Sequence, residues 1–77
     1  MNSPHTLLVR PAGPTDTRTV LRLAALDDAP APHGEVLLAE VDGEPVAALS
    51  RENGAVVADP FRPTAAVVQA LTAAAAA

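Results

Sequence analysis

The sequence predicts an α+β domain in which one antiparallel sheet packs with two helices, in the order β-α-β-β-β-α. Two observations support this. The dipeptides Asp42-Gly43 and Asn53-Gly54 are typical of tight hairpin turns, and they separate three runs rich in Val, Leu and Ala. Helix start signals precede an amphipathic stretch before these runs and an alanine-rich stretch after them. The chain has 77 residues, so residues 1–77 are expected to form a single small domain.

The first strand is expected at residues 5–10, and Pro11 should end it because proline cannot donate a ladder hydrogen bond. A helix over residues 13–28 follows. Gly13-Pro14 is a favourable start, and Asp16 falls in the first turn, where the helix dipole favours a carboxylate. Three-four spacing predicts an inner face of four apolar residues, Val20, Leu21, Ala24 and Ala25.

After a Pro-rich connector, the two turn dipeptides predict a meander of three strands at residues 35–41, 45–51 and 55–59. Pro60 ends the last strand. Thr64 is a favourable N-cap for a second helix from residue 65 onward. The inner face of that helix should contain Val67, Val68, Leu71 and Ala75. The alanine tail at residues 73–77 favours helix but specifies no partner, so we expect it to fray.

Composition excludes several classes of function. The net charge is −4, with five arginines and no lysine, which argues against binding to nucleic acid or to an anionic membrane surface. The absence of cysteine excludes disulfides, a thiolate nucleophile and cysteine-based metal sites. The N-terminus does not resemble a signal peptide, and the longest apolar segment, residues 64–77, is too short to cross a bilayer. We therefore expect a soluble, cytoplasmic protein.

No group of side chains in the sequence predicts a catalytic or metal centre. The two histidines, His5 and His33, are isolated and should be exposed. Four glutamates near strand ends are expected to be surface charges, and these are Glu35, Glu40, Glu44 and Glu52. Asp27-Asp28 should mark the exit of the first helix. Ser3 and Ser50 lack the sequence context of a hydrolase nucleophile.

An ordered set of segments resembles the first half of the GNAT superfamily of N-acetyltransferases. Such proteins often open with a strand ending in Arg-Pro-Ala and a helix with an early Asp, as in "LLVRPAGPTD". "AEVDGEPVAAL" is similar to a phrase in their meander, and "VVADPFRPTAAVVQAL" occupies the place of the next strand, the acyl-CoA loop and its helix. The resemblance covers nearly the whole chain but only about half of a GNAT domain. The later strands and helices, which complete the acceptor site, are absent.

The acyl-CoA loop of that family follows Arg or Gln, two residues, Gly, one residue, then Gly or Ala, and the matching run here is residues 62–67. Arg62 is kept, but Ala65 replaces the first glycine, Val67 fills the second small position, and Pro63 lacks an N–H. The resemblance thus implies a degenerate loop that would hold acetyl-CoA weakly, through Arg62, Thr64, Ala65 and Ala66. The other interpretation is a capped helix beside a solvated arginine.

Two functions from different classes follow. The first is a non-catalytic binding or assembly module that self-associates through the open edge of its last strand (residues 55–61), or docks on another protein chain. A small core with Phe61 as its only aromatic residue would be stabilised by such pairing. The alternative is a minimal acyl-CoA-binding protein or N-acetyltransferase, with its site completed across a dimer. The lack of tyrosine, a common catalytic acid in that superfamily, favours the non-catalytic module. A third possibility is a purely structural accessory protein that binds no small ligand.

Overall fold

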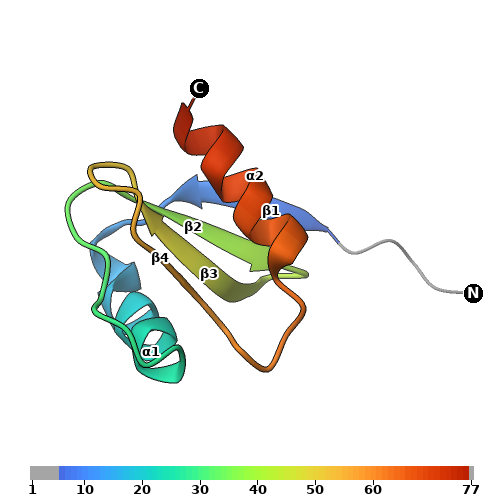
Figure 1. The fold of residues 1–77 in the computed structure, drawn as a ribbon, viewed down its shortest axis with the longest axis horizontal. Helices are drawn as coiled ribbons and strands as arrows, with labels where there is room; N and C mark the ends of the chain where they lie inside the picture. Colours follow the sequence, from blue (N-terminus) through green and yellow to red (C-terminus); the bar gives the residue numbers. More distant parts are fainter. Residues whose placement is uncertain (1–5, 77) are drawn as a thin grey trace, which may run out of the picture.

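The computed structural model describes residues 6–76 and has the predicted α+β order (Figure 1). A short 3-10 turn, Pro14–Asp16, leads into the first helix. The elements in chain order are β1 (Leu7–Pro11), α1 (Thr17–Leu26), β2 (Val36–Val41), β3 (Glu44–Ser50), β4 (Val56–Ala58) and α2 (Ala65–Ala76). The predicted start of the first strand at His5 lies outside the described residues, as do Ser3 and Ala77.

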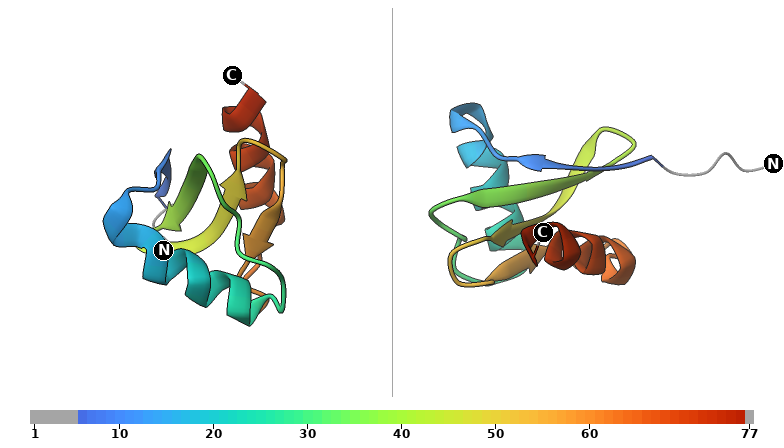
Figure 2. Two further views of the ribbon diagram at one scale, coloured as in Figure 1. Left: turned by 90° about the vertical axis from the view of Figure 1, so that its left-hand side faces the viewer. Right: turned by 90° about the horizontal axis from the view of Figure 1, so that it is seen from above.

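The four strands form one antiparallel sheet in the order β1-β2-β3-β4, with α1 on one face and α2 on the other (Figure 2). Leu23 of α1 packs with Leu38 and Val57 on the first face. Leu71 of α2 packs on the second face against smaller strand residues such as Ala47. The molecule therefore has one thin apolar layer on each side of its single sheet.

The main difference from the expected first strand concerns Pro11. It belongs to β1 and lies opposite Leu37 of β2. Pro11 does end the strand, as predicted, but it is the last residue of β1 rather than the first residue after it, and this is tolerated because β1 is an edge strand. The ring nitrogen of Pro11 faces away from β2, so no ladder hydrogen bond is lost.

The helix α1 is shorter than expected, and its buried face is different. Val20 and Ala24 are buried as predicted, but Leu21 is 55% exposed and Ala25 is also exposed. Leu23, which the prediction left out, is fully buried. The helix is rotated so that Leu23, rather than Leu21, packs with the sheet residues Leu38 and Val57.

The two hairpin signals have different outcomes. Asp42 and Gly43 both have positive φ (53° and 83°), as the predicted tight turn requires. In the second turn, Gly54 has positive φ and donates its N–H to the Ser50 carbonyl at 2.9 Å. The connection between β3 and β4 is therefore longer than a two-residue hairpin.

The helix α2 begins at the predicted residue and continues through Ala76, so residues 73–76 of the alanine tail are helical rather than frayed as expected. Val67 and Leu71 are buried, and Ala75 packs against the same apolar layer, as predicted, but Val68 is only partly buried and is not part of that layer. Gln69 and Thr72 lie on the exposed face. Within residues 6–76, no helix is long and apolar enough to cross a bilayer.

Candidate functional site

The loop between β4 and α2 borders a groove of about 400 Å³ at the end of the sheet formed by β1 and β2. Its lining is mostly apolar and consists of Leu7, Val41, Val46, Arg62, Pro63, Thr64, Ala66 and Val67. Three of the four residues expected to hold acetyl-CoA, Arg62, Thr64 and Ala66, are thus gathered at one groove. The fourth, Ala65, is exposed but does not line it.

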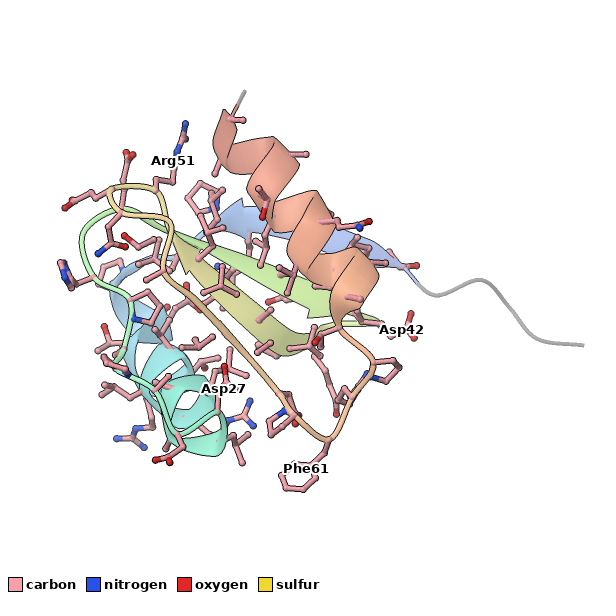
Figure 3. The ribbon with its side chains drawn as sticks, in the orientation of Figure 1. Asp27, Asp42, Arg51 and Phe61 are labelled. Carbon is pink, nitrogen blue, oxygen red and sulfur yellow. The ribbon has the colours of Figure 1, made fainter. Side chains whose placement is uncertain are left out.

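A compact turn makes the loop before α2. The Asp59 carbonyl accepts the N–H of Arg62 at 3.3 Å, and the Asp59 carboxylate accepts the N–H of Phe61 at 2.9 Å. Asp followed by Pro is a favourable pair for the first two positions of such a turn, since proline fixes φ and the carboxylate caps the next N–H groups. Phe61, 82% exposed, points away from the body of the molecule (Figure 3).

The guanidinium of Arg62 is partly exposed to solvent and is paired with a carboxylate. Its Nη1 forms an ion pair with the Glu44 carboxylate, at 2.5 Å from Oε2. Glu44 lies at the start of β3, far from Arg62 in sequence, so this pairing is a product of the fold. A bound phosphate would have to compete with Glu44 for Arg62.

The start of α2 offers main-chain donors beside this arginine. The Thr64 carbonyl accepts the N–H of Val68 at 2.8 Å, which places Thr64 at the N-cap position as predicted. The N–H groups of the first helical turn point out of the helix and have no acceptor within it. Any helix start has such groups, so by themselves they do not define an anion site.

A partly buried ion cluster that the sequence did not predict joins three elements. Arg10 of β1 contacts Asp16, at the start of α1, through two bonds of 2.9 Å, and Glu40 of β2 at 3.0 Å. The side chains of Asp16 and Glu40 are only 14% and 15% exposed. The expectation that Glu40 is a surface charge was therefore wrong. The signal in the sequence was the placement of Arg10 and Asp16 on either side of the Pro-Ala-Gly-Pro turn.

The charges in this cluster stabilise one another. Hydrogen bonds from Arg10, and then from the Gly13 N–H, lower the pKa of the Asp16 carboxyl to about 2. The hydrogen bonds to Asp16 and Glu40 raise the pKa of Arg10 above its ordinary value. The cluster fixes the path of the chain between β1 and α1, and all three side chains are engaged in it.

Hydrogen bonds from polar side chains also hold β4 and the connector before β2 in place. Asp27, the C-cap residue of α1, accepts the N–H of Ala58 at 3.2 Å (Figure 3). The fully buried Ser50 hydroxyl donates to the His33 carbonyl at 2.9 Å and accepts the Glu52 N–H at 3.3 Å. Asp27-Asp28 does mark the end of the helix, as predicted, with Asp28 at φ 50°, and Asp27 in addition accepts the hydrogen bond from Ala58.

The side chain of His33 is exposed, and residues 6–76 contain no metal-binding group of acidic residues and histidines.

The two outer strands expose main-chain groups at the margins of the sheet. On either side of β1, the Thr6 carbonyl accepts the Asp42 N–H and the Ala12 N–H donates to the Val36 carbonyl. Alternation therefore directs the main-chain groups of Leu7, Val9 and Pro11 outward. Leu7 and Leu8 are 42% and 49% exposed. β1 is therefore an open apolar edge.

At the other margin, the same alternation applies to β4. Ala55 and Asp59 bond to β3, so the main-chain groups of Val56 and Ala58 face outward. The Ala58 N–H is taken by Asp27, which leaves Val56 as the one outward donor within Val56–Ala58. The edge of the last strand is thus short and partly closed.

Comparison of the chain with protein-family models, with curated proteins and with solved structures gave no match. The resemblance to the GNAT superfamily therefore stays a prediction.

Proposed function

We propose that this chain is a non-catalytic, GNAT-like binding and assembly module that pairs with another chain through an open edge of its sheet. The main support is the outer side of β1, where Leu7 and Leu8 are half-exposed beside outward main-chain groups. Unpaired strand edges of this kind recruit further strands, either from a second copy or from an extended segment of another protein.

The edge of the last strand is the route expected from the sequence. In its favour, β4 lies at the margin of the sheet and is uncharged. Against it, the strand has three residues, and Asp27 already holds one of its outward N–H groups. The edge of β4 therefore supports fewer hydrogen bonds than the edge of β1.

Sedimentation velocity from micromolar to millimolar protein tests self-association. We expect a sedimentation coefficient that rises with concentration from the monomer toward the dimer value. A monomer that persists to millimolar concentration would refute self-association and leave only docking on a different chain.

The second candidate function is the binding of an acyl-CoA, and the groove beside Arg62, Thr64 and Ala66 favours it. Calorimetric titration with acetyl-CoA tests this. Micromolar binding that is lost on Arg62→Ala, is unaffected by Arg51→Ala and is strengthened by Glu44→Gln would support it, because the last change frees Arg62 from its ion pair. No heat with the wild type or with Glu44→Gln would refute it.

A further inference from the structure

We infer that the partner of β1 is the β1 strand of a second copy, paired antiparallel so that the two Leu8 residues face each other at a two-fold axis. Leu7 of each copy then lies opposite Val9 of the other copy. This inference rests on the proposed function and adds the edge, the partner and the register.

Hydrogen bonding restricts the register. Outward main-chain groups pair only with outward groups, so within the described part of this edge Leu7, Val9 and Pro11 pair only among themselves. Pairing Leu7 with Val9 of the second copy uses both outward N–H groups and both carbonyls of each strand. Pairing Val9 with Val9 would bring Leu7 opposite Pro11. The Leu7 carbonyl would then face a proline ring, and the Pro11 carbonyl already accepts a bond from Arg10.

Side-chain burial favours the same register. Opposite residues in an antiparallel pair share a face of the sheet. The Leu8 side chains, each 49% exposed in the monomer, meet each other on the face that carries α1. The Leu7 side chain, 42% exposed, meets Val9 of the second copy on the face that carries α2. The most exposed apolar side chains of the strand are thus covered.

Charge is compatible with this pairing. Residues 7–9 are uncharged, and the register sets Arg10 opposite Thr6 of the second copy, so no like charges face each other across the axis. Each copy carries a net charge of −4, which opposes association over longer distances. Added salt should therefore strengthen the dimer.

The contact is small. The edge is one five-residue strand that proline closes at one end, so the interface should bury less surface than stable dimers need. A weak dimer follows, with a dissociation constant on the order of 0.1 to 1 mM. It would join the four strands of each copy into one continuous sheet.

A charge exchange at Leu8 tests the register. Leu8→Glu and Leu8→Lys each place two like charges opposite each other at the axis. Each variant alone should raise the dissociation constant about tenfold or more. An equal mixture of the two should restore dimers, because opposite charges then face each other. Leu21→Glu is the matched control, since Leu21 is 55% exposed on α1, and it should leave the dissociation constant unchanged.

The test separates the possible failures. Leu8 pairs with Glu40 within the chain, so the melting temperature of each variant is measured first. If Leu8→Glu does not fold, Leu8→Lys, whose charge suits Glu40, tests the repulsion alone. If the wild type forms dimers and the Leu8→Lys variant forms them with the same dissociation constant, the register is overturned but self-association still stands. A wild type that stays monomeric at millimolar concentration would overturn both.

Discussion

β1 and β4 lie at opposite margins of one four-stranded sheet, but different contacts hold them. β4 has three residues, and its central Val57 is 1% exposed beneath α1. β1 has five residues, and it is held by its ladder with β2, by the ion pairs of Arg10 and by Val9, which is partly buried against the apolar layer of α2. Apolar packing under α1 and the hydrogen bond to Asp27 thus cover β4. The ladder and the ion pairs hold β1 in place but leave Leu7 and Leu8 exposed.

The comparison predicts the largest loss of stability from Val57→Ala. Val57 packs with Leu23 and Leu38, and its truncation removes apolar contacts in a layer that has few large side chains. We expect the free energy of unfolding to fall by about 2 kcal/mol, measured by urea denaturation. Val56→Ala, at a half-buried position of the same strand, is the control and should have a smaller effect. Equal losses at the two positions would contradict the account of this margin.

Ser50→Ala should have the next largest effect. The Ser50 side chain is fully buried, and its loss leaves the Glu52 N–H and the His33 carbonyl without this partner. We expect a loss of about 1 to 2 kcal/mol in the free energy of unfolding. Thr72→Ala removes an exposed hydroxyl bond on α2 and is the control. A Ser50→Ala variant as stable as Thr72→Ala would show that the buried hydroxyl contributes little.

Acid should lower the stability of the folded protein at β1, because it protonates Asp16, the partner of Arg10. The pKa of Asp16 is lowered from 3.8 to about 2 in the folded protein, so the unfolded chain takes up this proton first as the pH falls. The contribution of Asp16 to stability is therefore full above about pH 4 and is lost as the pH falls toward 2. Asp16→Asn should be less stable at neutral pH and should lose less stability between pH 4 and pH 2 than the wild type. Parallel acid profiles, measured by thermal melting, would refute this.

The smallest effect is expected at the open edge itself. Leu8→Ala, measured at micromolar concentration where the chain should be monomeric, should change the free energy of unfolding by no more than about 0.5 kcal/mol. Leu8 is half-exposed, and little apolar surface is lost. A loss comparable to that of Val57→Ala would mean that Leu8 belongs to the core of the monomer.

Local signals predicted most of the fold. The Asp42-Gly43 turn, Thr64 at the start of α2 and the three-strand meander follow from residues close together in the chain. The strand extends one residue further than predicted, to include Pro11, because proline is tolerated where β1 lies at an edge, and this is a property of the whole sheet. Leu21 and Leu23 compete for the inner face of α1, and only the position of the sheet decides between them.

The candidate site was predicted in part. The short motif around Arg62 identified three groove residues, since they are neighbours in sequence. The pairing of Arg62 with Glu44 and of Asp27 with Ala58 joins residues 18 and 31 positions apart. Such contacts depend on the strand order and the register, which the motif does not contain.

Amide hydrogen exchange, followed residue by residue by NMR at micromolar and millimolar protein, tests the central claim most directly. Pairing through β1 predicts that the outward amides of Leu7 and Val9 exchange rapidly at low concentration and become protected at high concentration. The outward amide of Val56 in β4 should exchange at the same rate in both samples. Protection of Val56 without protection of Leu7 and Val9 would contradict the account and place the interface at the edge of β4.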